Sequence, residues 1–301
     1  MTVASTAPRA RRERILVTGM PRSGTTWLSR LLATAPGTAL TGREPMNPRE
    51  RQWALAGSLD GWTRLRDPNG KQARALRRAY RGLAPGVYSS FGFRQWRGPL
   101  PNSRLIVKDP FAMLSMPAIH TITGARPVLV YRHPGAMLVS YRRMGWAPDV
   151  AELAPIAEEF IRAGGPTADL IPPSPADGDV GSAAAMAWFW SALYAIAVAD
   201  VTAIPGGAVV SHEAVAMDKD VCRRLHDELA MPWSAAAEAE FGRAGSGPID
   251  PGRLHNLDRR PSDVAQEWRT QVTETELAVL ENATAALRDR IDGLAFHLGA
   301  S

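Results

Sequence analysis

A loop bounded by two glycines near the start of the chain is the first place where residue types and spacing point to chemistry. Gly19 and Gly24 enclose Met-Pro-Arg-Ser, and Thr25 and Thr26 follow. This is the spacing of the phosphate-binding loop GxxxxGK[ST], except that Thr25 stands where the lysine would be. In such a loop, backbone N–H groups and the positive end of the next helix hold an anion. The sequence therefore predicts a phosphate site, to which the two threonine hydroxyls can add donors.

The missing lysine narrows the choice of ligand. In a P-loop the lysine reaches the β- and γ-phosphates, so its loss indicates a ligand with a shorter phosphate chain. Arg22, inside the loop, supplies a cation in its place. An alternative stays open at this point, which is a variant P-loop that binds some other nucleotide.

Two further polar clusters follow apolar segments in the middle of the chain. Lys108 and Asp109 come directly after one segment, and Arg132 comes directly after another. Ser140 lies eight residues beyond Arg132. If the chain turns into a helix at Pro134, Arg132 and Ser140 could converge on one phosphate. Lys108 alone could be a surface charge. It becomes a candidate site residue only because we expect it to lie beside the first loop.

The elements that must position these residues alternate between short strands and long connecting segments. Strands are predicted at 14–18, 104–107, 128–131 and 208–211, and the connections are long enough for crossover helices. This alternation is typical of a mostly parallel sheet with helices on both faces. Sites in such sheets lie at the carboxyl ends of the strands. We therefore expect an α/β protein with a single-domain, P-loop-like, three-layer fold.

The expected domain organisation is a disordered basic tail over residues 1–13, followed by one domain over residues 14–301. Excursions of helix and loop are expected within this domain at about 50–100 and 147–182. The apolar stretch 183–204 has about the length of a membrane span. Asp200 interrupts its end, so the sequence favours a buried core helix.

Composition limits the classes of partner. The net charge of +5 coincides with no nucleic-acid-binding motif, so it suits an anionic cofactor, and neither a nucleic-acid partner nor a membrane span is expected. The single cysteine, Cys222, excludes an internal disulfide and suits a reducing compartment. With no apolar signal segment after the first arginines, a cytoplasmic enzyme is expected. His212 and Glu213 have no further ligand at a suitable spacing, so no metal site is predicted.

Three ordered segments resemble one family of enzymes. PRSGTTWL resembles the 5′-phosphosulfate loop of sulfotransferases, which use 3′-phosphoadenosine-5′-phosphosulfate (PAPS) as sulfuryl donor. YRHPGAMLVSY resembles the family's 3′-phosphate motif, and VVSHEAVAMDKDVCRRLHDELAMP is similar to the strand, acidic turn and helix that close the fold. The likeness covers roughly 15–232, and a weaker version continues through Glu267, Trp268 and Arg269.

The resemblance implies which residues bind the cofactor. Arg132 and Ser140 would hold the 3′-phosphate, and a basic loop near the C-terminus would close over the nucleotide through Arg259 and Arg260. The residues that the first loop would contribute are Arg22, Ser23, Gly24, Thr25, Thr26 and Trp27.

The resemblance also suggests the catalytic groups. The histidine that aryl and steroid sulfotransferases use as base is absent, since Lys108 is followed by Asp109 and Pro110. The segments GREP, which contains Glu44, and KDPF instead resemble tyrosylprotein sulfotransferases, and GREP is also similar to a segment of heparan-type carbohydrate sulfotransferases. Those branches use a glutamate, which implies Glu44 as base, with Arg22 and Lys108 stabilising the transferring group. Without the resemblance, Glu44 would be interpreted as a surface or helix-capping carboxylate.

The expected reaction is sulfuryl transfer from PAPS to a hydroxyl or amine, without a metal ion. The acceptor stays open between a small molecule, a glycan and a peptide. A P-loop nucleotide kinase is one alternative, although it would need a loop lysine and carboxylates for Mg²⁺. A nucleotide-binding module without catalysis is another, and it would require nothing of Glu44 or Lys108.

Overall fold

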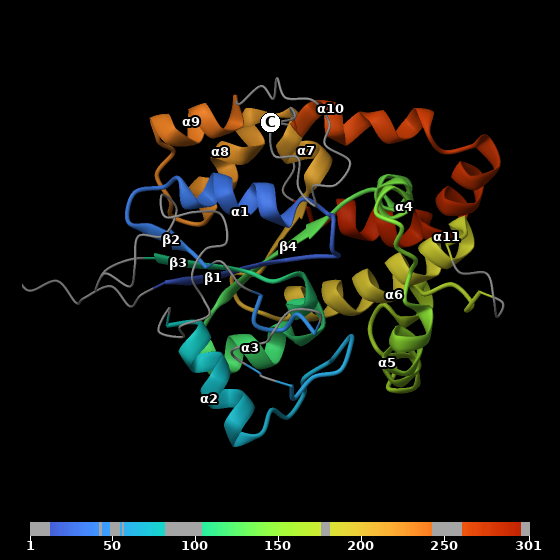
Figure 1. Ribbon diagram of the computed structural model, residues 1–301, viewed down its shortest axis with the longest axis horizontal. Helices are drawn as coiled ribbons and strands as arrows, with labels where there is room; N and C mark the ends of the chain where they lie inside the picture. Colours follow the sequence, from blue (N-terminus) through green and yellow to red (C-terminus); the bar gives the residue numbers. More distant parts are fainter. Residues whose placement is uncertain are drawn as a thin grey trace, which may run out of the picture.

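The computed structural model describes residues 13–41, 44–48, 55, 57–81, 104–175, 181–242 and 261–295. Within this part of the chain, five parallel strands form one sheet in the order β2-β3-β1-β4-β5 (Figure 1). The strands are β1 (Arg14–Thr18), β2 (Thr38–Leu40), β3 (Arg104–Lys108), β4 (Arg126–Tyr131) and β5 (Ala208–Ser211). Because β1 lies between β3 and β4, the carboxyl ends of all three meet at one edge of the sheet. The predicted α/β class is confirmed.

Helices cover both faces of this sheet. The α-helices are α1 (Thr25–Ala33), α2 (Gly70–Ala79), α3 (Met116–Thr123), α4 (Pro134–Arg143), α5 (Val150–Arg162), α6 (Ala183–Thr202), α7 (His212–Met217), α8 (Lys219–Glu228), α9 (Ala235–Phe241), α10 (Pro261–Gln266) and α11 (Glu274–Asp292). Three 3₁₀ segments lie between them, η1 (Pro110–Ser115), η2 (Ala168–Leu170) and η3 (Glu267–Thr270). Figure 1 shows α1, α8 and α9 above the sheet and α3 and α6 below it.

The strands are apolar on both faces, as a covered parallel sheet requires. Ile15 and Val17 of β1 pack in the core that contains α1 and α8, whereas Leu16 packs in the core that contains α6. In β4, Val130 packs in the core that contains α1 and α8, and Leu129 packs in the core that contains α6. Successive side chains of a strand point to opposite faces, so each strand contributes to both layers.

One strand escaped prediction. β2 has only three residues, Thr38–Leu40, and lies at the edge of the sheet, where it pairs with β3 alone. So short a segment carries too little periodicity to be recognised in a sequence. The other four strands match their predicted positions, although β3 extends to Lys108 and β4 begins earlier, at Arg126.

The long apolar helix α6 is the centre of the lower layer. Its length and composition would allow it to cross a membrane, but 89% of its most apolar window is buried inside the protein. Near its C-terminal end, Asp200 accepts two hydrogen bonds from the Arg64 guanidinium, at 2.5 and 2.8 Å. The helix therefore packs as the core helix that the sequence favours.

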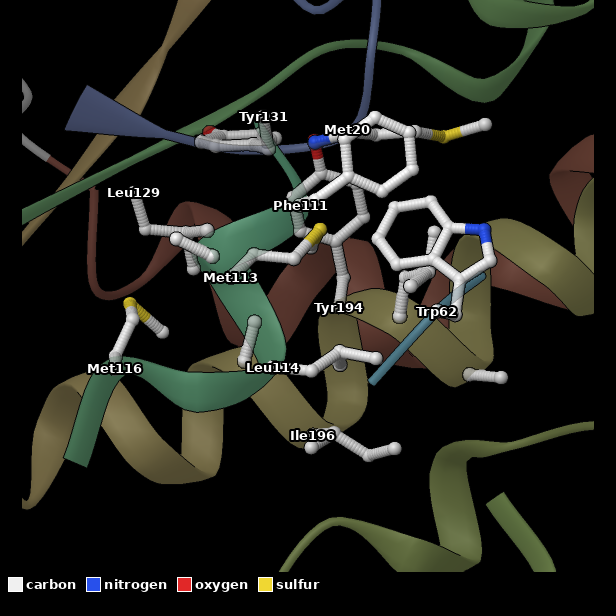
Figure 2. Close-up of a cluster of buried hydrophobic side chains, with 14 of the residues drawn as sticks. Met20, Trp62, Phe111, Met113, Leu114, Met116, Leu129, Tyr131, Tyr194 and Ile196 are labelled. Atoms are coloured by element: carbon white, nitrogen blue, oxygen red, sulfur yellow. The ribbon is translucent and has the colours of Figure 1, made fainter. Parts of the chain in front are cut away.

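We call the edge of the sheet at the carboxyl ends of β1, β3 and β4 the active edge. A cluster of buried apolar side chains lies beside it (Figure 2). Met20 of the phosphate loop and Phe111 of η1 belong to it, as does Trp62 from the first excursion. The Trp62 and Phe111 rings lie 4.8 Å apart between centroids. Burial of Met20 in this cluster anchors the loop from below.

Candidate active site

The phosphate loop needs glycine at both of its ends. Gly19 and Gly24 have φ angles of +148° and +97°, which side chains rarely tolerate. A Cβ at Gly19 would lie 2.1 Å from the Val130 carbonyl oxygen, and one at Gly24 would lie 2.3 Å from the His212 ring. The two glycines therefore let the loop pass between β4 and α7.

Inside the loop the backbone turns tightly and leaves the start of α1 open. The Ser23 N–H donates to the Met20 carbonyl at 3.0 Å. No side chain caps the N-terminus of α1, and no acidic residue lies in its first turn, where Thr25 and Thr26 are buried. Uncapped N–H groups at a helix N-terminus attract an anion. The loop thus has the local structure of a phosphate site.

Two arginines and a serine converge on this loop. The Arg22 Nε donates to the Ser140 Oγ at 3.1 Å, and Arg132 Nη1 lies 3.5 Å from the Arg22 carbonyl oxygen. Arg22 has a φ of +78°, which is uncommon for a residue with a side chain and indicates a strained backbone. Ser140 and Arg132 lie on either side of the turn at Pro134, where α4 begins, and both lie close to Arg22. Their binding of one phosphate stays a prediction.

Burial makes the positive charges of Arg22 and Arg132 costly to hold without a bound anion. It lowers the pKa of the Arg22 guanidinium, and it also lowers the pKa of Arg132, to which the nearby charge of Arg22 contributes. Glu213 opposes this effect at Arg132. Two cations held close together away from water favour a bound anion, which would compensate both.

Glu213 holds the end of β4 against β5. Its carboxylate accepts the His133 N–H at 3.0 Å, directly after Arg132. Burial raises the pKa of Glu213, although this hydrogen bond and the charge of Arg132 partly offset the shift. The acidic residue that the sequence placed in a turn therefore lies in the first turn of α7 and supports Arg132.

Two aromatic residues of α6 hold the same edge from below, and sequence reasoning did not identify either. The Tyr194 hydroxyl donates to the Val130 carbonyl at 2.8 Å and accepts the Met20 N–H at 3.3 Å. The Trp190 Nε1 donates to the Arg132 carbonyl at 2.9 Å. The signal in the sequence was weak, namely aromatic residues with polar tips inside an otherwise apolar helix.

Trp27 of α1 lies against α7, on the side of the loop away from α6. Its ring stacks on that of His212, with centroids 6.3 Å apart and planes 17° from parallel. Burial lowers the pKa of His212 well below its usual value, with a further effect of Arg132, so the ring is neutral. The stack places one face of Trp27 against the protein.

Glu44 and Lys108, the predicted base and one of the predicted cations, form an ion pair. Their side chains are 14% and 12% exposed, and the Asn47 amide also donates to the Glu44 carboxylate. The interpretation of Glu44 as a freely exposed surface carboxylate therefore does not fit. Gly42 and Arg43, which precede it, lie outside the described residues.

Asp109 fastens this pair to the sheet. Its fully buried carboxylate accepts the Met46 N–H at 2.5 Å and the Phe111 N–H at 3.2 Å. Burial raises the pKa of Asp109 well above its usual value, and the nearby charge of Glu44 adds to the shift. The segment that carries Glu44 is thereby held at the end of β3.

The phosphate loop and the segment that carries the Glu44–Lys108 pair are connected between β1 and β3. The Asp109 N–H donates to the Val17 carbonyl at 3.0 Å, and the Thr18 hydroxyl donates to the Asp109 carbonyl at 2.7 Å. An anion site built from two arginines and a helix N-terminus is thus connected directly to a carboxylate–ammonium pair. Such an arrangement can bind a phosphorylated ligand, remove a proton and stabilise developing negative charge.

Two of the predicted cofactor contacts, Arg259 and Arg260, lie outside the described residues. Among the residues that are described, no group of three or more His, Cys, Asp or Glu side chains could hold a metal ion. The other predicted site residues lie on the phosphate loop and the first turn of α1, on the segment after β2 that carries Glu44, at the end of β3, and on the β4–α4 segment.

Comparisons with known proteins agree with this geometry. A family model described as the sulfotransferase family matches residues 14–163, about half of the chain. No curated protein matches. Among solved structures, a sulfotransferase domain from the curacin biosynthetic pathway is 15% identical, with a TM-score of 0.50 over 93% of this chain and 99% of that chain.

Two further structures are less similar. A sulfotransferase domain from the Synechococcus PCC 7002 olefin synthase is 19% identical, with a TM-score of 0.47 over 91% of this chain and 96% of that chain. Mouse sulfotransferase SULT7A1, solved in complex with PAP, is 14% identical, with a TM-score of 0.45 over 95% of this chain and 89% of that chain. At such low identities, the likeness to the curacin domain supports the fold alone. With the matching family model and the fold taken together, the chain belongs to the sulfotransferase family.

Proposed function

We propose that this protein transfers a sulfuryl group from PAPS to a hydroxyl or amine of an acceptor and releases 3′-phosphoadenosine-5′-phosphate (PAP). The observation that carries the proposal is the convergence of Arg22, Arg132 and Ser140 beside the Glu44–Lys108 pair. The residues from 14 onwards would form one catalytic domain.

Two anion sites are needed for such a donor, and the residues suit both. The loop and the uncapped start of α1 would hold the 5′-phosphosulfate, while Arg132 and Ser140 would bind the 3′-phosphate. Thr25 in place of a loop lysine leaves no group to reach a third phosphate of a nucleoside triphosphate. Trp27 and, beyond the described residues, Arg259 and Arg260 would complete the nucleotide site.

The chemical step requires a base and cations. Glu44 would take the proton from the acceptor as its oxygen or nitrogen attacks sulfur. The bond between sulfur and the bridging phosphate oxygen breaks, and its electron pair leaves with PAP. Lys108 and Arg22 would stabilise the negative charge on the bridging and sulfuryl oxygens. The ion pair holds both groups at the same place before the acceptor arrives.

The acceptor would present a hydroxyl or an amine to Glu44. A small molecule, a glycan or a peptide would suit the catalytic groups equally, and we propose a cytoplasmic location. Incubation of the protein with labelled PAPS and fractionated cell extract, with detection of the compound that gains sulfate, would identify the acceptor.

Thermal stabilisation tests the choice of donor. A ligand that binds the folded state raises the melting temperature, by RT ln(1 + [L]/Kd) in free energy. We expect PAP to raise the melting temperature of this protein more than ATP with Mg²⁺ does. A larger increase with ATP and Mg²⁺ would rule out the proposed PAPS-dependent reaction in favour of a nucleotide kinase activity. Stabilisation by PAP without sulfuryl transfer to any acceptor would favour a binding module.

A further inference from the structure

Helix α2 presents an uninterrupted row of positive charges to solvent. Its side chains Lys71, Arg74, Arg77 and Arg78 are exposed, and so is Arg81 in the turn that follows. At 100° per residue these five cations occupy about 120° of the helix surface, over a length of about 15 Å. We call them the α2 basic stripe.

The opposite face of α2 is already occupied. Leu76, Ala79 and Tyr80 are buried, and the helix packs against α3. The helix therefore cannot rotate to bury its cations or to expose its apolar side. The α2 basic stripe is a fixed feature of the surface.

No described carboxylate pairs with the stripe. None of its five cations forms an ion pair within the described part of the chain, whereas Arg66 nearby pairs with Glu159. In the sequence, no Asp or Glu occurs between Asp67 and Asp109. Among the described residues, the charges of the stripe are therefore left without an acidic partner.

The stripe also acts against the stability of its own helix. Cations are favourable in the last turn of a helix, which accounts for Arg77 and Arg78, but unfavourable in the first turn, where Lys71 lies. Like charges three or four residues apart repel, and Arg74 has such neighbours on both sides. A bound anionic partner would relieve this repulsion.

The proposed cofactor cannot be that partner. Arg14 at the start of β1 donates to the Tyr80 carbonyl at 2.8 Å, so α2 ends near the amino end of the sheet. The phosphate loop follows the other end of β1. In Figure 1, α2 lies at the lower left beside α3, and α4 lies at the upper right. The stripe is thus a second positively charged surface, separate from the phosphate loop.

We propose that the α2 basic stripe binds an anionic lipid bilayer. A protein partner would need an apolar anchor at the contact, but the exposed large hydrophobic residues of the described chain, Ile161, Met217 and Val279, lie on other helices. Single-stranded nucleic acid would need exposed aromatic rings for base stacking, and α2 and its flanking turn expose none. Lipid headgroups are laterally mobile, so they can gather under an exposed row of positive charges.

The expected binding is electrostatic and reversible. Each basic residue near an anionic membrane surface contributes attraction that decays within a Debye length. Because the apolar face of α2 is buried, no side chain of the stripe would insert between lipids. The active edge of the sheet would face away from the bilayer, so the stripe would tether the enzyme at a membrane surface.

Sedimentation with vesicles tests this proposal with the full chain. We expect it to bind phosphatidylcholine vesicles that contain about 30% phosphatidylserine, but not pure phosphatidylcholine, and to dissociate at about 0.5 M salt. Arg74→Gln with Arg78→Gln should lower the partition coefficient roughly tenfold to thirtyfold. The matched control is Arg162→Gln with Arg290→Gln, which removes two exposed cations from α5 and α11 and should retain binding.

Three results would overturn the proposal. These are no binding to the anionic vesicles, an equal loss in the control variant, and displacement of the protein from vesicles by single-stranded DNA at the same phosphate concentration. The last result would assign the stripe to nucleic acid. Glutamine favours a helix about as well as arginine, so both variants should fold, and an unchanged melting temperature would verify it. Stabilisation by PAP should be the same in all variants, which separates this test from the proposed function.

Discussion

At Arg22, backbone conformation and charge depend on each other. Its φ of +78° costs free energy, of the order of 1–3 kcal/mol for such strained residues. That conformation turns the guanidinium towards Ser140 and brings the Arg22 carbonyl near Arg132. Strain held at a site by the surrounding structure is typical of a preorganised binding loop.

Substitution of Glu44 by glutamine tests its role as base. The amide retains the shape and the contact with Asn47 but cannot accept the acceptor's proton. Once an acceptor is known, we expect turnover to fall by about 100-fold to 10,000-fold, the usual contribution of general base catalysis. PAP should still raise the melting temperature, because Glu44 does not contact the two arginines. Glu238→Gln, on the exposed surface of α9, is the control. Unchanged turnover in Glu44→Gln would remove Glu44 as the base.

Substitution of Arg132 by alanine tests the second anion site. Loss of a charged hydrogen bond to phosphate, worth roughly 1.5–3 kcal/mol, should weaken PAP binding by about 10-fold to 100-fold. Calorimetric titration with PAP would measure this change. The control is Arg126→Ala, which removes an arginine from the opposite end of the same strand, where it pairs with Glu228. If both variants bind PAP equally well, Arg132 is not a phosphate ligand.

At the scale of elements, α6 sets the geometry of the active edge. Its aromatic residues bond to carbonyls at the ends of β4 and to the N–H of Met20, so the helix fixes strand and loop relative to each other. The hydrogen bonds are buried, which makes each of them costly to break. The proposed catalytic residues thus rely on a helix that carries none of them.

The hydroxyl of Tyr194 provides the test of this support. Tyr194→Phe removes the donor to Val130 and the acceptor for Met20 while it preserves the ring. We expect the free energy of unfolding to fall by about 1–3 kcal/mol and PAP binding to weaken, because Met20 begins the phosphate loop. Urea denaturation and PAP titration would measure the two effects. Ser191→Ala is the control on the same helix, since this buried hydroxyl has no hydrogen-bond partner in the described chain. Equal effects of the two substitutions would contradict a specific role for Tyr194.

At the scale of the whole molecule, His133 joins the active edge to the C-terminal helix. Its ring stacks on Trp268 at 4.3 Å, and its Nε2 lies 3.1 Å from the Glu281 carboxylate of α11. Burial lowers the pKa of His133 to about 4, with a further effect of Arg288, and Glu281 only partly opposes it. Segments far apart in the sequence therefore meet at a neutral histidine.

This contact predicts sensitivity to acid. A histidine with a pKa of about 6.5 in the unfolded chain and about 4 in the folded protein binds a proton more readily when unfolded. Its contribution to stability is complete above pH 6.5 and is lost as the pH falls through about 4. Between about pH 7 and pH 5 the loss should reach about 2 kcal/mol.

Urea denaturation of the wild type and His133→Gln at both pH values would isolate this effect. The buried carboxyl groups Asp109 and Glu213, whose pKa values are raised, change stability in the opposite direction, but they are common to both proteins. We expect the wild type to lose about 2 kcal/mol more than the variant on acidification. The same loss in both proteins would show that His133 is not the titrating group.

Features that depend on neighbouring residues could be predicted from the sequence. The glycine spacing of the loop and the apolar runs of β1, β3, β4 and β5 are local patterns, and the structure has them where they were expected. The contact between Arg22 and Ser140 follows once strand order is known, because both residues lie at the active edge. The roles of these residues stay predictions until the variants above are measured.

Features that depend on distant partners were beyond the sequence. β2 is a strand only because β3 lies beside it. The positive φ of Arg22 follows from loop closure against the rest of the site, and the hydrogen bonds of Trp190 and Tyr194 depend on how α6 crosses the sheet. These contacts join residues that are far apart in the sequence, so no short stretch of the sequence predicts them.

The strand order also governs when the active site can form during synthesis. β1 is made first, yet Ile15 pairs with Ile106 on one side and with Arg126 on the other. Until β3 and β4 have left the ribosome, β1 therefore has no strand partners to hold the phosphate loop that follows it. Pairings between such distant segments slow folding and leave apolar strands exposed in the meantime. A nascent chain that stops before Arg126 contains the whole phosphate-loop motif and still lacks β4, one of the two strands that hold β1 and its loop in place.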